Sequence, residues 1–180
     1  MDINMKIKTV ALIGMGAVGT VYGSLLYKRY GSNFAVISGK SRKEKLKKNG
    51  FNLNGNTFYP DVVSEGDSSI KYDLIIFSVK NYQLDEAIED VRSFVGKNTL
   101  LITFLNGVTA RSKIYSAYPG NKVFYGLSIK IDAIRTENGV TNTSDGEIQF
   151  GEADNTVISE EAQAVAGCFD EAGIQNIVFL

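Results

Sequence analysis

The sequence predicts an α/β protein whose sheet is doubly wound and mainly parallel, with a few antiparallel strands near the end of the chain. Short apolar runs alternate with segments in which apolar residues recur at helical spacing, and this alternation is typical of parallel strands joined by crossover helices. After Tyr125 the pattern changes, because Asn138-Gly139 and Asp145-Gly146 punctuate short alternating runs that favour antiparallel ribbons.

The first elements are strands that are apolar throughout and helices that end at glycine. In order, we expect strand Val10–Ile13, helix Ala17–Tyr30, strand Phe34–Ile37, a basic helix from Ser41 to Lys48 and a hairpin over Phe51–Tyr59. Gly31 and Asn49-Gly50 are the expected stops of the two helices, and Ser41 is the expected N-cap of the second. The pair Asn54-Gly55 predicts the turn of the hairpin.

The remaining elements continue the alternation. We expect strand Asp73–Val79, helix Leu84–Val95, strand Thr99–Phe104, helix Thr109–Tyr118, strand Val123–Tyr125, helix Ile158–Ala172 and a final strand over Ile174–Leu180. Glu160 and Glu161 fall in the first turn of the last helix, where negative charge interacts favourably with the helix dipole.

The composition narrows the chemistry. The 180 residues are 44% hydrophobic, which suits one packed domain, and 19 basic against 20 acidic side chains predict no nucleic-acid partner held by bulk charge. The absence of histidine excludes Ser-His and Cys-His catalysis and His-ligated zinc. The one cysteine, Cys168, excludes an intrachain disulfide and a cysteine metal cluster, and we expect it to be a buried thiol.

Apolar runs in this sequence are short. None reaches the roughly 18 residues that a membrane span needs, and the run beginning at Val10 is too short for a signal peptide. With one cysteine and no export signal, we expect a cytoplasmic protein without a membrane partner. The apolar stretch Ile174–Leu180 would promote self-association, so the sequence suggests a homodimer.

A glycine-rich turn separates the first predicted strand from the first predicted helix. Its residues, Gly14, Met15, Gly16, Ala17, Val18 and Gly19, form a G-x-G-x-x-G motif. The first glycine allows the tight turn, the second lets the backbone approach a pyrophosphate, and the third lets the helix pack closely on the strand. Because free N–H groups at a helix N-terminus bind anions, the motif predicts a Rossmann-type dinucleotide site. A purely structural strand-to-helix turn is the alternative.

The residues at the end of the second predicted strand indicate which dinucleotide the site would bind. A site that prefers NAD places Asp or Glu about 20 residues after the motif, to accept a hydrogen bond from the ribose 2′-hydroxyl. Here that position is Gly39, and its neighbours Ser38, Lys40 and Arg42 are hydroxyl-bearing or basic. Such side chains would bind a 2′-phosphate, so we expect NADP(H) as the cofactor. The alternative is that these basic residues only form the solvent-exposed start of a helix and bind no phosphate.

Two further polar residues follow buried strands, where open parallel sheets bind ligands. Lys80 follows the strand expected at Asp73–Val79, and Asn106 follows the strand expected at Thr99–Phe104. A cation in this crevice would suit an anionic substrate or cofactor. A solvated lysine and an ordinary Asn-Gly turn are the alternative interpretations.

With these motifs the chain resembles the N-terminal domain of ketopantoate reductase (2-dehydropantoate 2-reductase). The segments that support the resemblance are Ile13–Gly19, Ser78–Gln83 and Leu105–Val108, and Gly126–Gly151 is similar to the family's late ribbons. The resemblance covers nearly the whole chain. The glycine motif occurs in many dehydrogenases, whereas Lys-x-x-Gln followed by Asn-Gly is more specific.

The resemblance implies an NADPH-dependent oxidoreductase that reduces a 2-oxo acid, here 2-dehydropantoate to pantoate, a step towards pantothenate and coenzyme A. By the match, the glycine turn would hold the pyrophosphate, and Lys80 and Gln83 would line the cofactor and active-site cleft. Asn106 would contact the nicotinamide and, with Lys80, the substrate. The family often has arginine where this chain has Gly39, so a neighbour such as Lys40 or Arg42 would have to contact the 2′-phosphate.

The family also has a C-terminal helical domain, which supplies the proton-donating lysine. That lysine would lie after Leu180, so we expect residues 1–180 to be the NADP-binding domain, to lack the helical domain and to be inactive alone. A related NADP-dependent reductase of another 2-oxo acid and a non-catalytic dinucleotide-binding module remain alternatives.

Overall fold

The computed structural model describes residues 5–67, 69–105, 108–154 and 156–179, and its strands form one ten-stranded sheet. The parallel part consists of β1 (Val10–Ile13), β2 (Phe34–Ile37), β5 (Asp61–Val63), β6 (Leu74–Phe77), β7 (Leu100–Thr103) and the start of β8 (Val123–Thr136). With β3 (Phe51–Leu53), β4 (Asn56–Phe58) and β9 (Gly139–Gly151), the strand order is β4-β3-β9-β8-β7-β6-β1-β2-β5, and β10 (Asn176–Val178) pairs with β9. This Rossmann-like arrangement confirms the predicted α/β class.

Helices cover both faces of the parallel strands. Helices α1 (Ala17–Tyr30) and α5 (Glu160–Glu171) belong to the core on one face, and α3 (Leu84–Asp90) and α4 (Val108–Ala117) belong to the core on the other. Successive residues of β1 alternate between the two cores, and all four are buried. Because both faces are covered, an apolar run without alternation is what such a strand requires.

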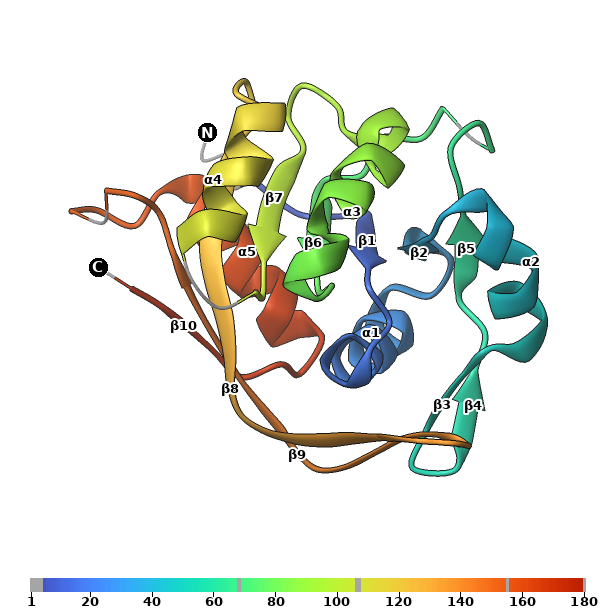
Figure 1. The fold of residues 1–180 in the computed structure, drawn as a ribbon. Coiled ribbons are helices and arrows are strands. Elements are labelled where there is room, and N and C mark those ends of the chain that lie inside the picture. Colours follow the sequence, from blue (N-terminus) through green and yellow to red (C-terminus); the bar gives the residue numbers. More distant parts are fainter. Residues whose placement is uncertain (1–4, 68, 106–107, 155, 180) are drawn as a thin grey trace.

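The long antiparallel ribbon of β8 and β9 (Gly139–Gly151) curls the sheet around α1. In Figure 1 the ribbon leaves the parallel strands and passes beneath α1 to the hairpin of β3 (Phe51–Leu53) and β4 (Asn56–Phe58). There Leu53 pairs with Val140. The hydroxyls of Tyr22 in α1 and Ser128 in β8 lie 2.7 Å apart in a hydrogen bond. The ribbon therefore packs against α1 on the side away from the parallel strands.

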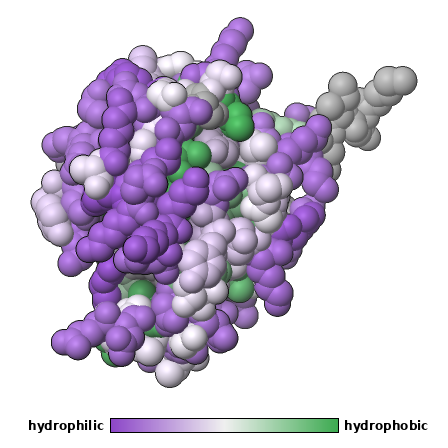
Figure 2. All heavy atoms as spheres, turned by 90° about the vertical axis from the view of Figure 1, so that its right-hand side faces the viewer, coloured by the Kyte–Doolittle hydropathy of each residue, from purple (hydrophilic) through white to green (hydrophobic). Residues whose placement is uncertain are grey.

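Helix α2 (Lys40–Asn49) differs from the others because it contributes no buried residue. Figure 2 shows the side of the molecule on which α2 and β5 lie, and this face is mainly hydrophilic. Gly50 ends the helix with a φ of 63°, as predicted. The predicted N-cap was wrong: Gly39 occupies that position without a side-chain cap, because the helix begins at Lys40 and includes Ser41 in its first turn.

Most predicted elements are present, with three corrections. Asp145-Gly146 is not a turn, because β9 continues through it and pairs with β8, while the hairpin turn lies before Gly139. Strand β5 was missed because it has only three residues and is defined by its pairing with β2. The helix predicted over Leu84–Val95 ends at Asp90, and a separate 3₁₀ turn follows over Arg92–Phe94. The last apolar run forms the short strand β10 (Asn176–Val178).

None of the helices in the described part of the chain has the length and apolar character that a bilayer crossing requires. A cytoplasmic location and a homodimer stay predictions of the sequence.

Helix α5 places the only cysteine in the core, as predicted. The Oγ of Ser159 caps the helix by accepting a hydrogen bond from the Ala162 amide at 3.1 Å. Cys168 is 2% exposed and lies in the core beside α1. Burial raises the pKa of the Cys168 thiol to about 12, so the reactive thiolate is scarce at neutral pH.

We expect Cys168 to resist a thiol-specific disulfide reagent in the native protein, because both burial and a raised pKa oppose reaction. The rate should be slower by roughly a hundredfold or more than in the denatured chain, since reaction requires local opening. Reaction of the native protein at the rate of the denatured chain would contradict the packing of α5.

Candidate dinucleotide site

The central strands end in register, which brings the predicted site residues to one edge of the sheet. Ile13 at the end of β1 pairs with both Ile37 and Phe77, and Phe77 pairs with Thr103. The residues that follow these four strands therefore lie side by side along the carboxyl edge. Ligands bind at this edge in open parallel sheets.

The glycine turn at this edge has the geometry that its sequence predicts. Gly14 has a φ of +102°, and a Cβ there would lie 2.6 Å from the backbone of Ser78. A Cβ on Gly19 would lie 2.0 Å from the Gly14 carbonyl oxygen. Gly16 is the N-cap of α1, and a Cβ there would meet no atom of the described residues within 4 Å. Gly14 and Gly19 thus allow close backbone packing, whereas Gly16 leaves open space before the N-terminus of α1.

A pocket of about 490 Å³ opens over this turn. Eight of the predicted site residues line it: Gly14, Met15, Gly16, Ala17, Ser38, Arg42, Lys80 and Gln83. Three others in the described part of the chain do not. Val18 packs against the core, Gly19 packs against Gly14, and Lys40 lies with Glu65 outside the pocket lining. Asn106, predicted to contact cofactor and substrate, lies outside the described residues.

The segment after β6 forms one wall of the pocket. The backbone N–H of Lys80 donates to Gln83 Oε1 at 3.4 Å, and the Gln83 N–H donates to the Lys80 carbonyl at 2.9 Å. Gln83 thereby closes the 3₁₀ turn that it belongs to. Between them, Tyr82 is 79% exposed and also lines the pocket. The local turn presents an exposed cation and an aromatic ring at the pocket wall.

Lys40 and Arg42, the basic residues predicted to bind the 2′-phosphate, are each paired with a carboxylate. Arg42 Nη2 lies 3.4 Å from Glu86 Oε1, and Lys40 Nζ lies 3.3 Å from Glu65 Oε2. These side chains are largely exposed, so each pair contributes little to stability and can exchange partners. Ser38 is buried, and its carbonyl accepts a hydrogen bond from the Ser64 hydroxyl at 2.6 Å.

Helix α3 brings two carboxylates to the end of β2, which the sequence analysis missed. Glu86 and Asp90 both line the pocket, and a Cβ on Gly39 would lie 3.5 Å from Asp90 Oδ2. Burial, assisted by the nearby charge of Glu86, raises the pKa of the Asp90 carboxyl above its ordinary value, while Arg42 acts in the opposite direction. No signal near Gly39 in the sequence could reveal them, because the contact depends on how α3 packs.

Arg135 is a third residue that the sequence analysis missed. It lies near the end of β8, lines the pocket, and donates from Nη1 to the Met15 carbonyl at 3.2 Å. The register of the ribbon shifts between Asp132 and Ala133, just before Arg135. The curled ribbon thus places a guanidinium beside the glycine turn, from 120 residues further along the chain. Its only sequence signal is an unremarkable basic residue in an alternating run.

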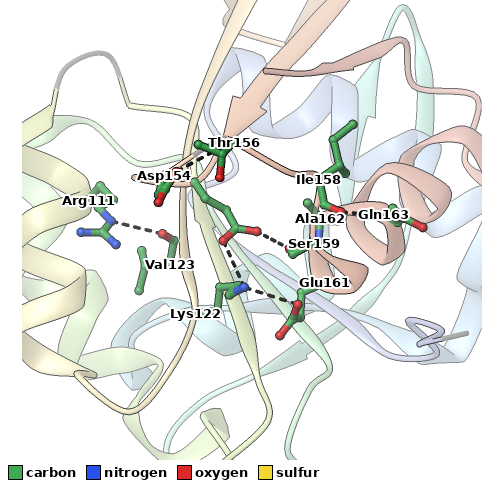
Figure 3. Close-up of polar contacts among 11 residues, drawn as sticks. Arg111, Lys122, Val123, Asp154, Thr156, Ile158, Ser159, Glu161, Ala162 and Gln163 are labelled. Carbon is green, nitrogen blue, oxygen red and sulfur yellow. Dashed lines mark hydrogen bonds and ion pairs between the residues drawn. The ribbon is translucent and has the colours of Figure 1, made fainter. Parts of the chain in front are cut away.

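A larger cavity, of about 810 Å³, lies at the opposite edge, where β7 and β8 begin. Figure 3 shows its polar groups: Lys122 Nζ lies 3.1 Å from Glu152 Oε2 and 3.3 Å from Glu161 Oε2, and Arg111 donates to the Val123 carbonyl. The Lys122 ammonium thus connects Glu152, which follows β9, to Glu161 in the first turn of α5, which is a structural role. Among the described residues no cluster of acidic or cysteine side chains could hold a metal ion.

Fold and site together define an α/β protein of the Rossmann-like class, with an open pocket at the carboxyl edge of its parallel strands. Comparison with known proteins is more specific. Residues 10–155 match the family described as ketopantoate reductase PanE/ApbA, and the chain belongs to that family.

Individual relatives agree with this assignment. The uncharacterized oxidoreductase YkpB of Bacillus subtilis is 30% identical over 137 residues, which is 74% of this chain and 45% of that protein. The 2-dehydropantoate 2-reductase of Lactococcus lactis is 27% identical over 92% of this chain and 54% of its own length. The crystal structure of 2-dehydropantoate 2-reductase from Methylococcus capsulatus is 29% identical with a TM-score of 0.77, covering 94% of this chain and 56% of that one. The chain thus spans about half the length of these relatives, which are oxidoreductases.

Substitution of the glycines should distinguish the glycine that packs closely from the one that faces open space. Gly19→Ala should destabilise the protein by about 2 kcal/mol or more, because its methyl group overlaps the Gly14 carbonyl. Gly16→Ala should change the free energy of unfolding by less than about 1 kcal/mol, since its methyl group enters open space. Urea denaturation measures both, and equal losses of stability would contradict the geometry of the turn.

Proposed function

We propose that this chain is the NADP(H)-binding domain of a reductase of 2-oxo acids, whose substrate is 2-dehydropantoate and whose product is pantoate. The observation that supports it most is the open space over Gly16, at the edge where Arg42 and Lys80 line the same pocket. Membership of the ketopantoate reductase family and the names of the relatives support the reaction class.

In this proposal the pyrophosphate binds at the N-terminus of α1. The first turn of that helix contains no acidic residue, so nothing there opposes the anion. A side chain at residue 16 would fill the space that the pyrophosphate needs. Arg135, which already donates to the Met15 carbonyl, supplies a positive charge beside this position.

The adenosine end binds where β2 ends. Arg42 is the proposed ligand of the 2′-phosphate, because it lines the pocket and its present partner, Glu86, is an exposed carboxylate. A phosphate dianion accepts two hydrogen bonds from a guanidinium and outcompetes a solvated ion pair. Lys40 is less suited to this role, since it pairs with Glu65 outside the pocket lining.

The substrate end lies near Lys80, whose ammonium can bind the carboxylate of a 2-oxo acid, with Asn106 as the second proposed contact. When bound, NADPH supplies the hydride that reduces the keto carbon. Reduction also needs an acid that protonates the alkoxide oxygen, and this chain has no histidine. We assign that acid to the part of the relatives' length that this chain does not span, so the chain alone should not turn over.

Arg42→Ala should weaken NADPH binding about tenfold and leave NADH binding nearly unchanged, because only NADPH has the 2′-phosphate. Lys47→Ala is the matched control, since Lys47 is also a basic residue of α2 but lies outside the pocket lining. Calorimetric titration of each variant measures the affinities. Equal wild-type affinities for NADPH and NADH, or no binding of either, would contradict the proposal.

With NADPH and 2-dehydropantoate, we expect no oxidation of NADPH above the blank, because we assign the proton donor to the part of the relatives' length that this chain does not span. We also expect 2-dehydropantoate to tighten NADPH binding about fivefold, since both contact the segment after β6 in this proposal. Robust turnover would contradict this assignment of the proton donor. Tightening by a different 2-oxo acid alone would favour a related reductase, and no effect of any 2-oxo acid would favour a non-catalytic module.

A further inference from the structure

Asp90, at the end of α3, has a carboxylate oxygen that the rest of the described chain does not satisfy. Its Oδ2 is buried and has no hydrogen-bond partner among the described residues, although the side chain lines the proposed dinucleotide pocket. Burying a carboxylate oxygen without a donor is costly, and such an oxygen in a native structure calls for an explanation. A hydroxyl or amino group of a ligand in the pocket would donate to this carboxylate from the side on which Asp90 lines the pocket.

The position of Asp90 indicates which part of a dinucleotide it meets. A carboxylate at residue 39, about 20 residues after the last glycine of the motif, would face the adenosine ribose in an NAD-preferring site. A Cβ at Gly39 would point at Asp90 Oδ2, 3.5 Å away, and at Glu86 Oε1, 3.8 Å away. The space that a residue-39 carboxylate would occupy is therefore reached by a carboxylate from α3 instead.

The surrounding charges give the two carboxylates different tasks. Glu86 is exposed and pairs with Arg42, so it can move with that side chain. Asp90 is more buried, and the charges that act on it are Glu86 and Glu65, which are negative, and Arg42, which is positive. A ribose hydroxyl can donate to Asp90. A 2′-phosphate at the same place would instead meet the negative charges of Glu86 and Glu65.

We propose that Asp90 is a specificity-determining residue that accepts a hydrogen bond from the adenosine ribose of NADH and opposes the 2′-phosphate of NADPH. This inference rests on the proposed function. Arg42 favours NADPH and Asp90 limits that preference, so the balance between them sets the cofactor selectivity of the site.

Asp90→Asn tests the inference, because it removes the charge and keeps the shape of the side chain. The ratio of the NADH to the NADPH dissociation constant should rise about tenfold or more, through weaker NADH binding and tighter NADPH binding. Asp85→Asn is the matched control: Asp85 is on the same helix but pairs with Lys113, 2.8 Å away, outside this pocket, and its ratio should stay within about twofold.

Each outcome decides the question. A ratio in Asp90→Asn within about twofold of wild type overturns the role of Asp90, even if NADPH binds as proposed. Failure of the wild-type chain to bind either nucleotide overturns the proposed function itself. Because Asp90 Oδ2 has no donor to lose, Asp90→Asn and Asp90→Ser should both fold, and unfolding of both would show that the carboxylate has a structural role instead.

Discussion

The close approach between the glycine turn and the strand beside it is the constraint on which the site depends. Gly14 can lie against the Ser78 backbone, and Gly19 against the Gly14 carbonyl, only because neither has a side chain. This contact holds the start of α1 directly over the ends of β1 and β6. The N–H groups of the helix then face the same pocket as the residues that follow β2 and β6.

The curled ribbon adds a second wall that a flat doubly wound sheet would lack. β8 and β9 pass around α1 and reach the β3–β4 hairpin, so a residue late in the chain returns to the glycine turn. Tyr22 holds the ribbon through Ser128, and Arg135 reaches the Met15 carbonyl. The ribbon therefore both encloses α1 on the side away from the parallel strands and adds positive charge near its N-terminus.

Charge at the proposed adenosine end of the pocket is balanced rather than simply basic. The sequence around Gly39 contains cations and no acid before Glu44, which favours a phosphate ligand. In the folded chain, Glu86 and Asp90 from α3 and Glu65 from the loop after β5 stand opposite these cations. In the proposed site, selectivity between the two cofactors would then depend on which charges the ligand displaces, and not on the local sequence alone.

The sequence by itself determined the order and type of nearly all elements, the buried Cys168 and the glycine turn, because each depends on local periodicity or on a backbone conformation that few residues adopt. It did not reveal β5 or the true N-cap of α2, since a three-residue edge strand and a helix start depend on their neighbours. Only the tertiary structure decided that Arg135 and Asp90 join the pocket and that Lys40 does not. The reason is physical: contacts between residues far apart in the chain follow from strand register, sheet curvature and helix packing, and no short stretch of sequence encodes these.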